Sequence, residues 1–297
     1  MSNLKALKAR IKSVKSTQKM TKAMKMVAAS KLRKAKRNVE LSRPYAEKID
    51  ELISDLAANI NFRDHHENFE LLAGRKEEKN YLLVVLSSDR GLCGGLNSSA
   101  VKFAKRQIIN LEAKGKNVKI LCIGKKAYDQ LKPIYGNKII DLVGGIFKKD
   151  ITTDVAKKVV DKILTLFAAK EFDVCQVIYS KFKSAIAQEA KIKQIIPIAI
   201  EQEELDDDLP KFNSPFVFEP DQEEILANLL PQNLTMQIYN ELLENSASEQ
   251  GARMAAMEAA TNNAGKMIKN LTLIYNRTRQ ANITKELIDI VSGANSV

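Results

Sequence analysis

A heptad pattern of apolar side chains occupies the first sixty residues. Seventeen positions, spaced alternately by three and four residues, run from Leu4 to Ile60, and thirteen of them are apolar. One register kept over such a length predicts a coiled-coil helix, because only a long partner helix can cover so long a seam. Pro44 removes one backbone hydrogen bond and is expected to kink this helix without ending it.

The C-terminal part of the chain carries a similar pattern. Ten of the fourteen seam positions between Leu229 and Tyr275 are apolar. The pattern predicts a helix from about Asp221 to about Ile290, roughly 100 Å long, against roughly 85 Å for the N-terminal helix. A compact domain cannot enclose either helix, so each is expected to be the partner of the other.

The chain order predicts that the two helices pair antiparallel, because an intervening domain returns the chain to its starting end. Residues 46–60 should then lie near Leu229–Leu243, and Leu4–Val14 should lie against Ile268–Tyr275 or beyond. Since the second helix is the longer one, its last turns, Ile288–Val291, should extend past Met1 as a single apolar helix tip.

Between the helices the apolar pattern changes its period. Short apolar runs alternate with amphipathic stretches, which favours a largely parallel α/β sheet. The expected strands are residues 81–86, 118–123, 173–179 and 191–200; the expected helices are 97–114, a short one from 125, and 152–170, capped by Thr152 or Thr153. The predicted fold is therefore a long antiparallel coiled coil of the terminal helices with an inserted Rossmann-like α/β domain. The expected segments are an N-terminal helix 1–60, a linker 61–80, the α/β domain 81–200, a linker 201–220 and a C-terminal helix 221–297.

The positive charge of the chain is concentrated in one element. The formal net charge is +11, whereas residues 1–40 alone hold thirteen Lys or Arg and a single acid, Glu40. Six lysines follow one helical stripe: Lys5, Lys8, Lys12, Lys15, Lys19 and Lys22. The stripe is either a solvated face or one that lies opposite an acidic surface; its self-repulsion favours the acidic partner.

No catalytic constellation is evident. The glycine-rich stretch Ser87–Asn97 (SSDRGLCGGLN) follows a predicted strand, but it matches neither dinucleotide-binding nor phosphate-loop spacing. His65 and His66 have no metal-ligand partners at useful spacing, and the carboxylates of 203–208 lie in an expected linker. We therefore expect an interaction loop, no cofactor, no metal and no small-molecule ligand.

Cysteine usage and hydropathy limit the compartment. Cys93, Cys122 and Cys175 show no CxxC spacing and are expected to be reduced thiols. No apolar run reaches the length of a membrane span, and the heptads begin at Leu4 without a recognisable leader.

Three stretches resemble the γ-subunit family of F-type ATP synthases, of the bacterial type. They are SVKSTQKMTKAMKMVAASKLR at 13–33, SSDRGLCGGLN at 87–97, and the C-terminal run that includes SEQGARMAAM at 248–257 and LIYNRTRQANITKELIDIVSG at 273–293. The stretches occur in the family's order over the whole chain. The departures are small: Gly251 replaces a better helix former, and Gln18, Thr21 and Lys25 make part of the seam polar. No cysteine-bearing regulatory insert of the chloroplast type is present.

The resemblance implies a non-catalytic rotor shaft that couples proton flow through a membrane ring to ATP synthesis or hydrolysis on surrounding subunits. The implied partners are the α and β subunits of the catalytic hexamer, the ε subunit and the c-subunit ring, at the cytoplasmic face of a bacterial inner membrane. The implied contacts with the catalytic collar are Met24, Lys25, Arg253, Arg279, Gln280, Thr284 and Glu286. The implied contact loop at the foot is Ser88, Asp89, Arg90, Gly91, Leu92, Cys93 and Gly94. The heptad register turns Lys25 inward, whereas the resemblance turns it outward.

Three other functions remain possible from the residues. The basic N-terminal helix could bind nucleic acid, although it lacks interleaved aromatic residues and a recognition module. The α/β domain could belong to a nucleotide-dependent enzyme, against which the missing phosphate-binding motif argues. A purely structural coiled-coil scaffold would not need the inserted domain.

Overall fold

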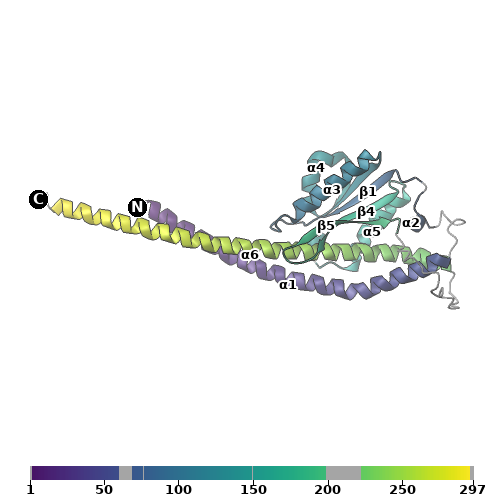
Figure 1. Ribbon diagram of the computed structural model, residues 1–297, viewed down its shortest axis with the longest axis horizontal. Helices are drawn as coiled ribbons and strands as arrows, with labels where there is room; N and C mark the ends of the chain where they lie inside the picture. The colour runs from purple at the N-terminus through teal and green to yellow at the C-terminus, as the bar shows by residue number, and fades with distance from the viewer. Residues whose placement is uncertain (1, 60–68, 76, 149, 199–221, 295–297) are drawn as a thin grey trace. The chain divides into compact units, whose positions relative to one another are not determined.

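The computed structural model describes residues 2–59, 69–75, 77–148, 150–198 and 222–294 (Figure 1). Its two long helices are α1 (Ser2–Asn59) and α6 (Gln222–Ala294), and α1 continues through Pro44. The internal contacts divide the chain into two compact units, residues 1–30 with 253–297 and residues 31–252. Both long helices contribute to both units.

In the first unit α1 and α6 pair antiparallel. The hydroxyls of Thr21 and Thr261 are 2.7 Å apart, and Lys25 Nζ lies 2.6 Å from Glu258 Oε1. Gln18 Nε2 reaches the carbonyl of Thr261 at 3.5 Å. The α1 residue number rises while that of its partner falls, which confirms the antiparallel prediction for this unit.

Burial along the helices follows the predicted heptads. In the first unit the seam positions of α1 from Leu4 to Ala28 are buried or half-buried, and so are those of α6 from Met254 to Tyr275. The six lysines of the stripe are exposed. Beyond Asn282 the helix is exposed to its last described turn, with the apolar side chains of Ile283, Leu287, Ile288, Ile290 and Val291 in solvent.

The second unit contains the same helix pair beside an α/β sheet. Ser42 Oγ donates to Asn240 Oδ1 at 2.7 Å. Ile49, Ile53 and Leu56 of α1 share one apolar core with Leu226 to Leu243 of α6, as the antiparallel prediction requires.

The sheet has five strands in the order β3-β2-β1-β4-β5. Four strands run parallel: β1 (Asn80–Leu86), β2 (Asn117–Ile123), β3 (Ile139–Val143) and β4 (Val174–Phe182). The edge strand β5 (Gln188–Ile196) is antiparallel to β4. A largely parallel sheet is therefore confirmed, and its antiparallel strand arises from a hairpin.

Alternate residues of β1 point to opposite faces of the sheet, as strand geometry demands. Leu83 and Val85 pack with α3 (Leu96–Ala113) and α4 (Lys125–Tyr135) on one face. Leu82 and Val84 pack on the other face with α5 (Thr153–Ala168) and with the second-unit parts of α1 and α6. The sheet is thus covered on both sides (Figure 1).

Strand β3, helix α2 (Glu70–Ala73) and two short 3-10 helices, Gly136–Lys138 and Ile146–Lys148, were not predicted from the sequence. Strand β3 is a half-exposed edge strand of five residues, too short and too mixed in polarity for a recognisable apolar run. Helix α2 lies in the interval expected to be a linker. There Phe69 and Leu72 are buried in the core, and the Arg75 guanidinium donates to the carbonyls of Phe172 and Phe167.

The end of β5 and the N-cap of α5 also differ from the sequence-based prediction. Strand β5 ends at Ile196 rather than Ile200, because Pro197 cannot donate a ladder hydrogen bond. Thr152 precedes α5 with extended backbone, as an N-cap does, but its side chain makes no capping hydrogen bond. The expected linker 201–220 and the histidines His65 and His66 lie outside the described residues.

The antiparallel register predicts a selective disulfide. In a chain whose three native cysteines are replaced, Thr21→Cys with Thr261→Cys should cross-link on mild oxidation, because the two side-chain oxygens are in contact. The matched control, Thr21→Cys with Thr272→Cys, should stay reduced. Non-reducing electrophoresis reads both pairs, and a disulfide in the control pair alone would contradict the register.

Candidate interaction surfaces

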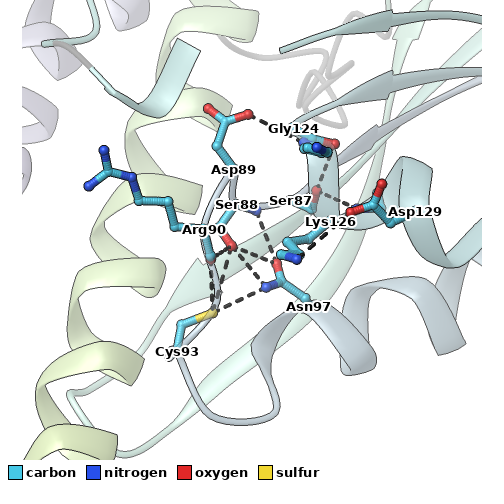
Figure 2. Close-up of polar contacts among 11 residues, drawn as sticks. Ser87, Ser88, Asp89, Arg90, Cys93, Asn97, Gly124, Lys126 and Asp129 are labelled. Atoms are coloured by element: carbon cyan, nitrogen blue, oxygen red, sulfur yellow. Dashed lines mark hydrogen bonds and ion pairs between the residues drawn. The ribbon is translucent and has the colours of Figure 1, made fainter. Parts of the chain in front are cut away.

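The glycine-rich loop between β1 and α3 is built around a buried polar cluster (Figure 2). The side-chain amide of Asn97 donates to Ser88 Oγ at 2.8 Å and to Cys93 Sγ at 3.2 Å. Its oxygen accepts the Ser88 N–H at 3.0 Å. All three side chains are buried. These residues therefore fix the loop conformation and are not available to a partner.

Asp89 ties the loop to the neighbouring chain segments. Its carboxylate accepts the backbone N–H groups of Gly145 at 3.0 Å and of Lys125 and Phe147 at 3.3 Å. Ser87 Oγ accepts the N–H of Ala127 at 2.8 Å in the first turn of α4. Both side chains satisfy backbone donors that the chain would otherwise leave unpaired.

Within residues 88–94 the exposed ones are Arg90, Gly91, Leu92 and Gly94, and Gly95, the next residue of the loop, is exposed as well. Leu92 is 62% exposed and has a positive φ of 66°. A non-glycine residue in this backbone region is strained, and such strain is typical of residues held for contact. Of the seven residues expected in a contact loop, these four can reach a partner, whereas Ser88, Asp89 and Cys93 support the loop from within.

The loop packs on α6 through its buried cysteine. Cys93 and Leu96 form a small apolar cluster with Ala252. Ala252 directly precedes Arg253 in α6, one of the residues expected to face a collar of catalytic subunits. The loop is thereby anchored to α6 and does not lie free at an end of the sheet.

Lys25 lies at the edge of the helical seam. Its side chain is 36% exposed, and its ammonium group pairs with Glu258, whose side chain is 51% exposed. Lys25 is thus neither fully buried in the seam, as the heptad register predicts, nor fully turned outward, as the resemblance implies. An exposed pair of this kind contributes about 0–1 kcal/mol, so it leaves Lys25 open to a competing carboxylate. Met24, beside it, is half-buried. The sequence analysis missed Glu258, since nothing in its surroundings marks it as a partner.

The other expected collar residues fall into separate places on α6. Arg253 is half-buried, while Arg279, Gln280, Thr284 and Glu286 are exposed. Thr284 Oγ1 donates to the Gln280 carbonyl at 3.0 Å. Along the helix, Glu258 and Arg279 are separated by roughly 30 Å. The structure therefore brings Lys25 to Glu258 but does not bring it to the 279–286 group.

Burial raises the pKa of several ionisable groups in the second unit. Burial raises the pKa of the Cys122 thiol to about 12, and burial likewise raises the pKa of Cys175. All three cysteines are free. Burial also raises the pKa of Glu241 to about 7, an effect that the nearby Lys193 ammonium opposes. Within the described ranges no group of three or more His, Cys, Asp or Glu could hold a metal ion. Among those same residues, no helix is long and apolar enough to cross a membrane.

Comparison with known proteins decides the family. A family model described as ATP synthase matches residues 3–297. The ATP synthase gamma chain of Pelagibacter ubique is 48% identical over 297 residues, covering all of both chains. The chain belongs to the ATP synthase gamma chain family. The gamma chain of Methylobacterium nodulans is likewise 48% identical over the full length of both chains.

Solved structures agree with this assignment. The central stalk and c-ring structure of the Tetrahymena thermophila mitochondrial ATP synthase contains a chain 27% identical to this one, with a TM-score of 0.61. The match covers 81% of this gamma-family chain and 99% of that one. A chain in the Euglena gracilis mitochondrial ATP synthase, in rotational state 3, shares the fold with a TM-score of 0.70 at 18% identity, covering 99% and 94% of the two chains.

Substitution by alanine at Gly115 and at Gly124, which lie before and after β2, should lower the stability of the chain by different amounts. Gly124 has a φ of +95°, and a Cβ there would lie 2.1 Å from the Ser87 carbonyl oxygen. Gly115 has a φ of +71°, but nothing lies within 4 Å of a Cβ. Gly115→Ala should lower the free energy of unfolding by about 1–2 kcal/mol. Gly124→Ala should cost about 4 kcal/mol or more, because the backbone must also move. Urea denaturation measures both, and equal losses would contradict the packing at Gly124.

Proposed function

We propose that this chain is the rotating central stalk of a bacterial F-type ATP synthase. One observation supports the proposal most strongly. This chain matches gamma chains over its full length, and its two terminal helices pack antiparallel with their heptad side chains buried or half-buried. Continuous side-chain packing resists twisting of one helix against the other, which a torque-bearing element requires. The similar chain of Tetrahymena thermophila belongs to a central stalk and c-ring structure, and we extend the central-stalk role to this chain.

The proposed partners are the α and β subunits of the catalytic hexamer around the helix pair, with the ε subunit and the c-subunit ring at the foot. Proton flow turns the ring and the stalk, and the asymmetric stalk drives each catalytic subunit through its binding states. The exposed lysine stripe from Lys5 to Lys22 supports an acidic surface opposite α1, since six like charges repel one another without one.

We further propose two sets of collar contacts. Met24 and Lys25 would meet the acidic lever loops of the catalytic subunits. The half-buried Arg253 and the exposed Arg279, Gln280, Thr284 and Glu286 would make the polar contacts that engage the collar and transmit torque. The exposed apolar side chains of the last turns, Ile288, Ile290 and Val291, would turn inside the far end of the collar with few polar contacts to break.

The exposed loop residues are proposed as a further contact. The resemblance alone suggested the foot of the stalk for this loop. Packing of Cys93 against Ala252, next to Arg253, supports the collar side instead. The positive charge of Arg90 and the apolar Leu92 would suit the same acidic levers.

The stalk itself is proposed to be non-catalytic and to bind no nucleotide, cofactor, metal or nucleic acid. ATP would be made on the surrounding subunits. The complex would place this chain at the cytoplasmic face of the inner membrane, attached peripherally through the ring.

Co-purification tests the proposal directly. A tagged copy expressed in its own cells should bring down a membrane ATPase containing α, β, ε and c subunits at fixed stoichiometry. Recovery of the tagged chain without these subunits would contradict the proposal.

The purified chain alone should neither hydrolyse ATP nor bind it tightly. The loop glycines lack phosphate-binding spacing, and Asp89 already occupies the nearby backbone donors of Gly145 and Phe147. Isothermal titration with Mg-ATP should show no saturable heat. Stoichiometric binding at micromolar affinity would overturn the assignment of Ser87–Asn97 as a contact loop.

Charge reversal at Lys25 can separate its pairing with Glu258 from its proposed contact with a lever loop. Lys25→Glu should lower ATP-driven proton pumping per ATP hydrolysed in reconstituted vesicles, because it repels both Glu258 and an acidic lever. Loss of the exposed pair should cost the free chain only about 1 kcal/mol or less.

The matched control is the swap of Lys25→Glu with Glu258→Lys, which regains the pair within the chain. If Lys25 acts on the collar, the swap should remain impaired. A swap that pumps and synthesises like the parent would limit Lys25 to pairing with Glu258.

A further inference from the structure

The last residue of β4, the half-buried Phe182, packs against both long helices. The ring of Phe182 packs against Leu32 and Ala35 of α1 and against Ala247 of α6. The Lys36 ammonium lies 4.9 Å from the centre of the same ring, at cation–π distance. One side chain of the α/β domain thus contacts both helices within the second unit.

Gly251 permits the close contact between Phe182 and α6. A Cβ at position 251 would lie 2.8 Å from Phe182 Cε2 and 3.5 Å from the Cα of Ala185. The ring and the hairpin backbone therefore rest directly on the helix backbone. Gly251 shows no positive φ, so close approach and not backbone conformation accounts for it. Glycine within a helix costs about 1 kcal/mol relative to alanine, a cost that this contact offsets.

Polar side chains of α6 complete the junction. Past Ile178, no strand among the described residues pairs with β4 on the side that β1 covers, and α6 supplies hydrogen-bond partners there. Ser248 Oγ donates to the Ser180 carbonyl at 2.7 Å, and Glu244 Oε2 accepts the Phe182 N–H at 3.0 Å. Ser248 is fully buried, so its loss would leave a carbonyl unsatisfied away from water.

A second contact lies on the same stretch of α6. Ala252, the next residue after Gly251, packs against Cys93 and Leu96 of the β1–α3 loop. Two separate parts of the α/β domain, the β4–β5 hairpin and this loop, are therefore attached to residues 244–252. From Arg253 onward α6 continues as the same helix into the first unit.

We propose that Phe182 and Gly251 form the joint through which torque passes between the α/β domain and the helix pair. The inference rests on the proposed stalk function. A rotor driven at its foot must transfer torque from the domain to both helices. A ring packed against both α1 and α6, on a strand whose backbone is hydrogen-bonded to α6, resists sliding of the domain against the pair. Phe182 and Gly251 are positioning residues, since they touch no substrate.

The test compares three variants of the whole complex reconstituted in vesicles: Phe182→Leu, Gly251→Ala and the double variant. Each single change should lower proton pumping per ATP hydrolysed by about twofold or more, while hydrolysis persists. The double variant should recover coupling, because leucine leaves room for the new methyl group. Recovery by a second substitution is not expected of two independent structural defects.

Gly265→Ala is the matched control, a second α6 glycine whose added Cβ would meet only the flexible Gln18 side-chain end at 3.1 Å. It should pump normally. Should Gly251→Ala fail to assemble, Ser248→Ala, which removes one hydrogen bond of the junction, should still uncouple. Normal pumping by Phe182→Leu and Ser248→Ala would contradict the proposed torque path through Phe182 and Gly251, but not the stalk function. A complex with the parent chain that neither hydrolyses nor pumps would instead contradict the stalk function.

Discussion

Burial of two heptad seams against each other is the constraint on which the rest of the structure depends. Neither α1 nor α6 can cover its apolar stripe without the other, and both stripes are buried or half-buried at the predicted positions. Polar residues interrupt the seam at Thr21 and Thr261, whose hydroxyls bond to each other. Such a partly buried polar pair favours one alignment of the helices over others, at a cost in packing energy. The seam therefore determines pairing, and its polar layer helps to determine register.

The sequence predicted the helices and most of the sheet because their signals are periodic and long. Strand β3 and helix α2 were missed because each is short, and their stability comes from contacts distant in sequence. Arg75 illustrates the point: its guanidinium binds carbonyls almost a hundred residues away, which no local pattern reports. The candidate residues were identified by resemblance, but their division into exposed and supporting roles required the structure. Cys93 and Ser88 are motif residues that turn inward, while Glu258 and Phe182 carried no motif at all.

The structure explains why a glycine stands at position 251, where the sequence favours a better helix former. In the sequence it is a poor helix former within a long helix. In the structure it is the place where a phenylalanine of the α/β domain meets the helix backbone. A local conflict with helix propensity that a tertiary contact resolves is typical of sites under functional constraint. The same stretch of α6 also receives the β1–α3 loop, which concentrates the attachment of the domain within a few helical turns.

The rotation of this chain inside its α and β subunits can be observed with a reporter group. A reporter can be attached at Ile109→Cys, since Ile109 is 58% exposed on α3 and the three native cysteines are buried. The labelled chain would be assembled with its α and β subunits, and the collar fixed to a surface. The reporter should turn in one direction, in steps, only while ATP is hydrolysed. Sustained ATP hydrolysis with a reporter that keeps a fixed orientation would contradict it.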